Sequence, residues 1–347
     1  MSGESIWQKE ISGEDIKKLF VIIFDKLLYI ISTLNYKIYD YGSKIISKYG
    51  SKFAITFFLI PSLGFITIFY FIPFVLTFLI GLTAMDFTFE WSWVGLQNFI
   101  RIINDSFAPK ILGNTFFYVF TTLSLFNVGM ALIVSLITNH IPEGVGSAIR
   151  GIWLLPRITP STVYALLWLW AARREENALI NWFLSLFGIP PMDWMLNQPW
   201  AIVILVNGFV GTSFGMIVFT AALKSIPEDY YRAARVDGAS TWDIIRYIEI
   251  PMIKWPLLFV TAYQTLSLLT SFEYILILTD GGPGLYTTEV WSLYSYHLAF
   301  RSYGGTVEIG YGAALATILV LIGIVLSIIY WKVFRFKELM LEPKIEV

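Results

Sequence analysis

Long runs of apolar residues dominate the chain and are separated by shorter polar segments. Each run has roughly the 20 residues that an α-helix needs to cross a bilayer, and none alternates as the strands of a membrane barrel do. The runs cover residues 54–82, 115–139, 152–171, 201–223, 257–278 and 310–331. This pattern predicts an all-α membrane protein with six transmembrane helices in a domain of residues 53–335, followed by a tail, 336–347.

The residues before the first run follow a different pattern. From about Lys17 to Tyr49, apolar residues recur at helical spacing, with lysines and aspartates at the other positions. This favours an N-terminal extension, residues 1–52, that forms an amphipathic helix on the membrane surface. The alternative is a seventh span over residues 19–34. It would place Asp25 and Lys26 at its centre, where each charge costs about 2.5 kcal/mol or more.

The positive charges indicate the orientation of the spans. The N-terminal segment, the second and fourth loops and the tail carry 18 lysines and arginines, whereas the opposite loops carry 5. Because cytoplasmic loops are enriched in Lys and Arg, we expect a multi-pass protein of the cell membrane with both termini in the cytoplasm. The first eighteen residues are polar and charged, so we expect no cleavable signal peptide.

Composition excludes several classes of function. Of 347 residues, 14% are charged, against about 25% in soluble domains, and the net charge of -1 predicts no nucleic-acid partner. There is no cysteine, and the two histidines, His140 and His297, are too far apart to suggest a metal site. The sequence has no phosphate-binding P-loop and no nucleophile with a base, so we expect a chain that is not an enzyme and binds no cofactor.

A charged segment, residues 226–251, interrupts the apolar runs on the cytoplasmic side. Pro227 suits the first turn of a helix, Gly238 suits its end, and Ser240 with Asp243 resembles the capping box of a second helix that Pro251 ends. Such a helix–turn–helix has more order than a connector needs and therefore predicts a docking surface. The alternative is an amphipathic hairpin resting on the membrane; a DNA reader is excluded because spans hold both ends.

This segment resembles the EAA loop of ABC-importer permeases. Ala233-Ala234, Asp237-Gly238-Ala239 and Ile250-Pro251 stand at the spacing of that family, whereas Arg232 occupies a position that is usually glutamate. Further segments, which extend the resemblance over nearly all of the chain beyond residue 54, are similar to the carbohydrate branch, the maltose and glycerol-3-phosphate importer type. They are Trp93–Phe99, Asn114-Thr115, Leu155-Pro156, Thr279–Pro283 and Tyr311–Ala314.

The resemblance implies a type I importer permease whose coupling helix docks in a groove of a cytoplasmic ATPase. The residues expected at that contact are Tyr230, Tyr231, Arg232, Ala233, Ala234, Asp237, Gly238 and Ala239. It also implies a second homologous permease, two ATPase subunits that bind ATP and Mg, and a lipid- or membrane-anchored sugar-binding protein outside the cell. The segment expected to face this receptor, unless it is only an exposed turn, is Asp280, Gly281, Gly282 and Pro283.

Polar residues within the spans suggest where a sugar crosses, because such residues usually point into a bundle or a wet cavity. The candidates are Asn207, Ser213, Gln264, Ser271, Glu273 and Tyr274. The alternative is that these side chains bond their own backbone or a neighbouring helix. Arg157, between two prolines, either lines the same path or holds a kinked third helix to its neighbour.

Together these patterns predict the permease subunit of an ABC sugar importer, forming half of the translocation path. One alternative is an ABC permease for a polyamine, phosphate or peptide, against which the carbohydrate-type segments argue. The other is an ion-coupled secondary transporter. That class often shows inverted repeats, and the sequence shows no clear internal repeat.

Overall fold

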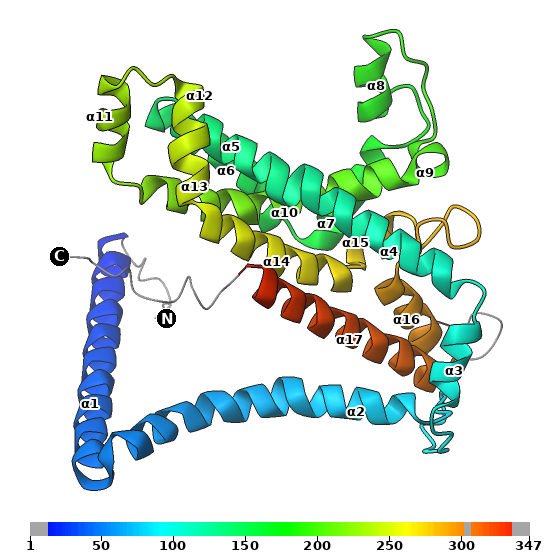
Figure 1. The fold of residues 1–347 in the computed structure, drawn as a ribbon, viewed down its shortest axis with the longest axis horizontal. Helices are drawn as coiled ribbons and strands as arrows, with labels where there is room; N and C mark the ends of the chain where they lie inside the picture. The colour runs from blue at the N-terminus through cyan, green and yellow to red at the C-terminus, as the bar shows by residue number, and fades with distance from the viewer. Residues whose placement is uncertain (1–12, 302–306, 335–347) are drawn as a thin grey trace, which may run out of the picture. The chain divides into compact units, whose positions relative to one another are not determined.

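The computed structural model describes residues 13–301 and 307–334, which form helices joined by loops (Figure 1). The chain divides into two compact units, Met1–Phe74 and Val75–Val347. The first unit contains α1 (Gly13–Ile66) and the π-helical turn η1 (Thr67–Phe71), and α2 (Ile72–Gly81) leads into the second. All the candidate sites lie in the second unit.

The N-terminal extension does not end where the sequence pattern changes. α1 is one continuous helix of 54 residues, so the predicted boundary at residue 52 falls inside it. Helix propensity explains the difference, because lysine and leucine both favour helices although their hydropathy differs. The surface placement of residues 17–49 stays a prediction, and residues 1–12 lie outside the described residues.

The second unit is a bundle of long helices with shorter helices at its two ends. The shorter elements at one end are α3 (Gln97–Asn104), α8 (Leu179–Ser185), α9 (Trp194–Asn197), α15 (Glu273–Leu278) and α16 (Trp291–Phe300). Those at the other end are α11 (Glu228–Val236), α12 (Thr241–Ile244), η3 (Ile245–Glu249) and α13 (Ile250–Met252). The long helices between these ends are the continuous segment of α4 (Ala108–Thr122), η2 (Leu123–Met130) and α5 (Ala131–Asn139), together with α6 (Glu143–Ile158), α7 (Ser161–Ala171), α10 (Pro199–Lys224), α14 (Lys254–Thr270) and α17 (Ile309–Val333).

Four of the six predicted spans are continuous helices in the part of the chain that the structure describes. They are Ile55–Gly81, Ala108–Asn139, Pro199–Lys224 and Ile309–Val333. The second starts before residue 115, so Asn114-Thr115 lies inside the helix and does not open it. The third and fifth predicted spans are each divided, between α6 and α7 and between α14 and α15.

The two divisions have different causes. Pro160 disfavours a helical conformation at the residue before it; Thr159 is extended, with ψ 134°, and α7 begins after the proline. The fifth span has no proline at its division. There Ser271 is extended, with ψ 116°, and its hydroxyl accepts a hydrogen bond from Asn207 of α10 at 2.9 Å. A contact between helices therefore accompanies the second division.

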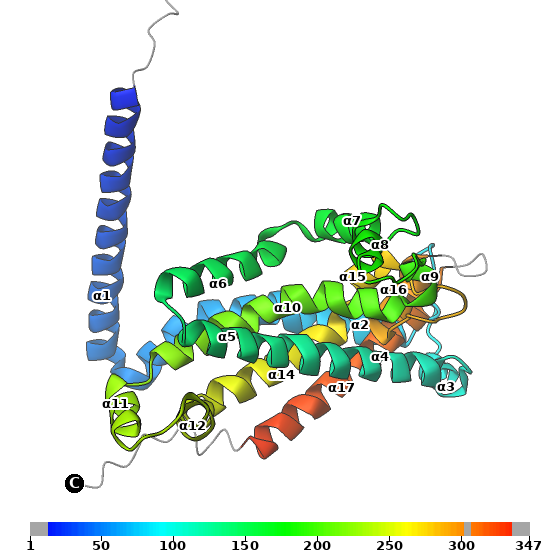
Figure 2. The ribbon, with the colours of Figure 1, turned by 90° about the horizontal axis from the view of Figure 1, so that it is seen from above.

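α10 lies at the centre of the bundle (Figure 2), where it packs against α5, η2, α6 and α14. In the most apolar 18-residue stretch of α10, 67% is buried inside the protein, whereas the corresponding stretch of α17 is 28% buried. Gly215 permits this close packing. A Cβ atom at Gly215 would lie 2.4 Å from the main-chain oxygen of Asn127 and 2.7 Å from Cβ of Ala131. Small residues let helix backbones approach closely within a membrane.

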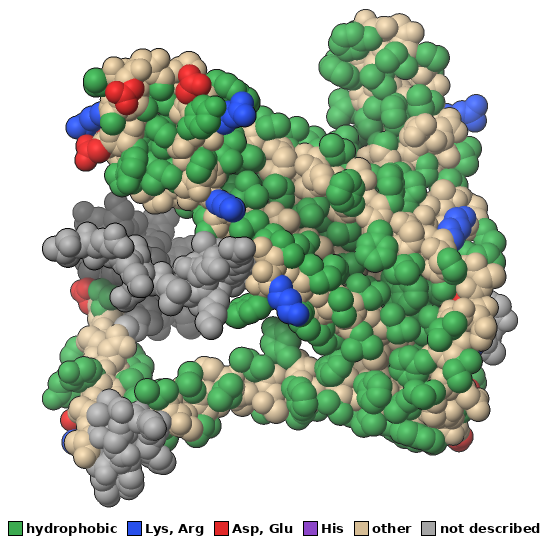
Figure 3. Space-filling model, viewed as in Figure 1, with side chains coloured by type: hydrophobic (Ala, Val, Ile, Leu, Met, Phe, Trp, Pro, Cys, Tyr) green, Lys and Arg blue, Asp and Glu red, His purple; other side chains and the backbone are tan. Residues whose placement is uncertain are grey.

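The two predicted docking segments lie at opposite ends of this bundle (Figure 1). Charged side chains gather over α11 and α12, whereas the surface of the long helices is mostly hydrophobic (Figure 3). This distribution suits a bundle that crosses a membrane with residues 226–251 and 279–290 on opposite sides. Which side is cytoplasmic stays a prediction from the distribution of Lys and Arg.

Candidate functional site

The segment between α10 and α14, here called the coupling loop (residues 225–253), begins with a helix whose start is confirmed. Pro227 is extended, with ψ 135°, directly before α11. Glu228 and Asp229 occupy the first turn, where carboxylates interact favourably with the positive end of the helix dipole. The start of α11 is therefore encoded by residues next to it in the sequence.

The glycine turn and the second helix start are also as predicted. Gly238 has φ +81°, and its N–H bonds the carbonyl of Arg235 at 3.2 Å, while the N–H of Ala239 bonds the carbonyl of Ala234 at 2.9 Å. These two bonds form a Schellman motif, which favours glycine at the left-handed position. The capping box that follows, Ser240 with Asp243, is present with both of its bonds.

The end of the second helix differs from the prediction. The helix does not stop at Pro251 but continues to Met252, after the π-helical turn η3. Proline lacks the N–H that an α-helical bond would use, and the π-helical turn lies directly before it. Of the apolar side chains in this helix, Trp242 is 66% exposed, whereas Ile244 is 5% exposed and packs inward.

The predicted ATPase contacts divide into an outer and an inner set. The exposed residues are Tyr230, Arg232, Ala233, Asp237 and Gly238. Ala234 and Ala239 are half-buried, and Tyr231 is only 8% exposed. These three side chains pack on an apolar cluster formed by Leu223, Ile226, Ile244 and Ile253. Tyr231 as a surface contact is therefore wrong for this structure: Tyr231 and Ala234, at i and i+3, share the inward face of α11.

Glu249 is fully buried beneath the coupling loop and joins it to the second span. Its Oε1 accepts hydrogen bonds from Nδ2 of Asn139 at 2.8 Å and from the Tyr231 hydroxyl at 3.1 Å. Its Oε2 lies 3.1 Å from Nε2 of His140. Burial raises the pKa of Tyr231 to about 12, and the Glu249 carboxylate acts in the same direction, so this hydroxyl donates throughout the physiological range. One carboxylate thus connects α11 and η3 with the end of α5.

A cavity of about 310 Å³ lies beside this network, between the coupling loop and the ends of α5 and α10. Its lining includes Lys224, Glu228, Tyr231 and Arg235. Lys224 is also held by Glu143 of α6, with 2.7 Å between Nζ and Oε1. The coupling loop is therefore not packed evenly on the bundle, and the Glu249 network is its main polar connection to α5.

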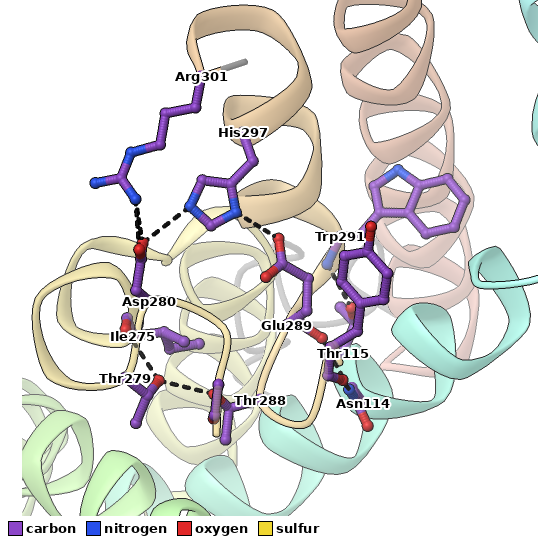
Figure 4. A network of polar contacts seen from close by, with 12 residues as sticks. Asn114, Thr115, Ile275, Thr279, Asp280, Thr288, Glu289, Trp291, His297 and Arg301 are labelled. Atoms are coloured by element: carbon purple, nitrogen blue, oxygen red, sulfur yellow. Dashed lines mark hydrogen bonds and ion pairs between the residues drawn. The ribbon is translucent and has the colours of Figure 1, made fainter. Parts of the chain in front are cut away.

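The predicted receptor-facing residues begin a folded loop between α15 and α16, here called the outer loop (residues 279–290). Asp280 and Gly281 have positive φ angles, 50° and 81°. The two ends of the outer loop are joined by a 2.7 Å contact between the hydroxyls of Thr279 and Thr288. The Thr288 N–H also donates to the Gly281 carbonyl at 2.9 Å. The close-up shows the contact between Thr279 and Thr288 (Figure 4). The loop is therefore more than an irregular exposed turn.

Exposure within the outer loop differs along the predicted segment. Asp280 is exposed, Gly282 and Pro283 are half-buried, and Gly281 is buried against Glu289. The exposed tip comes later, at Gly284 and Leu285, the latter 65% exposed. Within the segment predicted to face the receptor, Gly281 therefore offers no surface, because it packs on the side chain of Glu289.

Helix α4 anchors the outer loop from below (Figure 4). Asn114 donates from Nδ2 to three main-chain carbonyls, those of Tyr286 at 3.0 Å, Thr287 at 3.3 Å and Glu289 at 2.9 Å. The hydroxyl of Thr115 accepts a bond of 2.8 Å from the N–H of Trp291, at the start of α16. The Asn-Thr pair that the sequence placed at a helix start therefore holds the outer loop.

Most candidate residues of the substrate path bond within the bundle. Gln264 donates to the Gly211 carbonyl at 2.9 Å, and the Ser213 hydroxyl donates to the Val210 carbonyl at 2.6 Å. Asn207 donates to the hydroxyls of Ser271 and Tyr118. These contacts fit the alternative reading of polar residues as connections between helices.

The remaining candidates lie at the junction of the two divided spans. Glu273, at the start of α15, is exposed and accepts a hydrogen bond of 2.5 Å from the hydroxyl of Ser161, at the start of α7. Tyr274 is half-buried, with its ring centroid 6.0 Å from that of Tyr164. Arg157 is exposed on α6, with its guanidinium 5.6 Å from the ring centroid of Phe214 on α10. Charged side chains at interrupted helices usually face a wet cavity or a partner.

Sequence reasoning missed the residues that fasten the two loops to the bundle. Glu249 stands alone among apolar neighbours, Ile248 and Ile250, and an acid at such a position was the available signal. His297 was considered only as a metal ligand, although its side chain is fully buried beside the outer loop. Nothing in the sequence indicated the partners of these residues, because those of Glu249 lie on α5 and α11 and those of His297 lie in the outer loop, away from the helix that carries it.

Comparison with known proteins agrees with these features. A family model described as the binding-protein-dependent transport system inner membrane component matches residues 128–335. The trehalose/maltose transport system permease protein MalF of Thermococcus litoralis is 33% identical over 288 residues, which cover 81% of this chain and 93% of that protein. The lactose transport system permease protein LacF of Rhizobium radiobacter is 27% identical and covers 81% of this chain and 94% of that protein.

Solved structures show the same fold. A chain of a bacterial ABC transporter involved in the import of the acidic polysaccharide alginate has a TM-score of 0.68 and 24% identity. The similarity covers 86% of this chain and 99% of that one. The family match and the 33% identical relative show that this multi-pass membrane protein belongs to the binding-protein-dependent transport system inner membrane components.

Proposed function

We propose that the chain is the transmembrane permease subunit of an ABC sugar importer and forms one half of the translocation path. The observation that carries this proposal is the similarity to the trehalose/maltose permease over 93% of that protein's length. Relatives named for lactose and for arabinooligosaccharides favour a sugar over the other cargoes. A second, homologous permease completes the path, and the orientation places both termini in the cytoplasm.

The exposed side of the coupling loop contacts a cytoplasmic ATPase in this proposal. It presents Tyr230, Arg232 and Ala233 on α11, Asp237 and Gly238 at the turn, and the exposed ring of Trp242. Two such ATPase subunits bind ATP and Mg, and this chain binds neither. Their closure moves the coupling loop, which the Glu249 network connects directly to the end of α5. A displacement is therefore passed to the second span as well as to the fourth and fifth.

At the other end, the outer loop contacts a sugar-binding protein in this proposal. One similar solved structure is an alginate ABC transporter in complex with a periplasmic protein that carries an alginate pentasaccharide. In this chain the exposed tip at Gly284-Leu285 and Asp280 offer the contact. The sugar then passes the junction of Ser161 and Glu273, whose polar groups can exchange hydrogen bonds with hydroxyls.

Energy coupling tests the proposed class. In proteoliposomes that hold the assembled transporter with its receptor, uptake of labelled maltose or trehalose is expected to require internal ATP and to be blocked by vanadate. Ionophores that collapse proton and sodium gradients are expected to leave uptake unchanged. Uptake that survives vanadate and is abolished by the ionophores would contradict the proposal and indicate a secondary transporter.

Replacing Gly238 with valine is expected to lower ATP-coupled uptake about tenfold or more. A residue with a branched side chain adopts the left-handed conformation only at a cost of ~1–2 kcal/mol, so the turn would be misplaced. No atom would meet the new Cβ within 4 Å, so the effect comes from φ +81° alone. Asparagine tolerates this conformation, and Gly238→Asn is the matched control with near-normal uptake. Equal loss in both variants would show that the turn conformation does not matter.

A further inference from the structure

The outer loop is tied to α16 by a fully buried histidine. The side chain of His297 is 0% exposed, and it lies between two carboxylates of the outer loop (Figure 4). Its Nδ1 is 2.8 Å from Oε1 of Glu289, and its Nε2 is 3.1 Å from Oδ1 of Asp280. Asp280 opens the outer loop and Glu289 closes it, so one imidazole holds both ends.

The titratable and charged groups beside this imidazole lie in the outer loop and on its own helix, α16. The outer loop contributes Asp280 and Glu289, with Tyr286 beside Glu289, and α16 and its end contribute Tyr296 and Arg301. Arg301 donates from Nη1 to Oδ1 of Asp280 at 2.6 Å. Gly281 packs so closely on Glu289 that a Cβ atom there would overlap Oε2 of this carboxyl group. The backbone of the turn thus depends on where the Glu289 carboxyl lies.

The number of protons on these groups decides how many hydrogen bonds they make. A neutral imidazole carries one N–H and one lone pair, and an ionised carboxylate only accepts. Two contacts from ring nitrogens to two carboxylate groups therefore need a second proton, either on the ring or on a carboxyl group. Burial raises the pKa of Glu289, and the hydrogen bond with His297 opposes that shift only in part. This places the second proton on the Glu289 carboxyl group, within its hydrogen bond to His297.

We propose that His297 is a positioning residue for the receptor-facing loop, and that a proton shared with Glu289 keeps Asp280 and the turn after it in the docking shape. As pH rises and this proton leaves, one of the two contacts loses its hydrogen, and a lone pair then faces a carboxylate. The outer loop loosens with rising pH, as linkage requires for a group whose pKa is raised in the folded state. The receptor role rests on the proposed function, whereas the proton and the loop shape do not.

Hydrogen exchange tests this on the full chain in nanodiscs, without receptor, ATPase or sugar. Protection factors of the amides in residues 279–290 are expected to fall as pH is raised from 5 to 9 in the wild type. In the His297→Gln chain these amides are expected to exchange about tenfold faster at low pH, the ratio for losing one charged hydrogen bond, with no further step. His140→Gln removes the other histidine and is expected to leave the outer loop unchanged.

The variant Glu289→Gln separates the proton from mere packing. Its amide mimics a carboxyl group that keeps its proton, so the outer loop is expected to stay protected at every pH. Equal protection factors in wild type and His297→Gln, or a pH step that persists in Glu289→Gln, would overturn the proposal. Because no transport is measured, this outcome is independent of the vanadate experiment, which alone decides the energy source.

Discussion

Replacement of Glu249 by leucine is expected to lower the free energy of unfolding by about 3 kcal/mol and to uncouple uptake from ATP hydrolysis. Leucine fills a similar volume but accepts no hydrogen bond. The Nδ2 of Asn139 and the hydroxyl of Tyr231 would both lose their acceptor in a buried site. Thermal unfolding of the purified chain in detergent and uptake per ATP hydrolysed by the assembled transporter measure the two effects.

Two further variants control this prediction. Glu249→Gln keeps an acceptor oxygen and is expected to lose only about 1 kcal/mol. Glu228→Gln removes an exposed acid whose pair with Arg235 spans 3.7 Å, and exposed pairs contribute about 0.2–1 kcal/mol or nothing. Stability in Glu249→Leu equal to that in Glu228→Gln would show that the buried network does not hold the coupling loop.

Replacement of Gly215 by leucine is expected to prevent the bundle from packing. The expected loss of folding free energy is above about 4 kcal/mol, a size that single substitutions reach only through a few mechanisms such as overpacking of a core. The first atom of the new side chain would lie 2.4 Å from the main-chain oxygen of Asn127. A rotamer change cannot relieve contact with a backbone atom, so α10 and η2 would have to separate. The yield of monodisperse protein on size-exclusion chromatography measures this loss.

Gly113 is the matched control for this change. It lies in α4, in the same continuous helical segment as Asn127, and a Cβ atom there would have no neighbour within 4 Å. Gly113→Leu is expected to be neutral or to add up to about 1 kcal/mol through helix propensity. Similar losses in both variants would show that any large side chain is harmful in these helices, and that the contact at Gly215 is not special.

Local structure in the coupling loop could be predicted well. Gly238 in the left-handed conformation and the capping box of Ser240 and Asp243 depend on residues a few positions apart. The four continuous spans were predictable too, because a bilayer needs long apolar helices. The division at Thr159 also has a local cause, Pro160, but hydropathy alone does not reveal it because the proline stands inside an apolar run.

Which side of a helix faces the bundle was harder to predict. Tyr231 and Ala233 both fitted a docking face by composition, yet Tyr231 is buried and Ala233 is exposed. α11 is short and strongly polar, so its few apolar residues did not define the inward side. Gln264 and Asn207 were similarly ambiguous, because a buried polar side chain suits either a substrate or a neighbouring helix.

The sequence alone therefore determined the membrane class, the order of the spans and the fold of the coupling loop, since short-range signals encode each of them. Only the tertiary structure decided which side chains meet. Glu249 accepts a hydrogen bond from Asn139, which is 110 positions away in the sequence. Glu273 accepts one from Ser161, which is 112 positions away. The division at Ser271 is accompanied likewise by a contact with α10, and His297 is enclosed by the outer loop. Such contacts follow from the packing of distant helices, which hydropathy and local spacing do not specify.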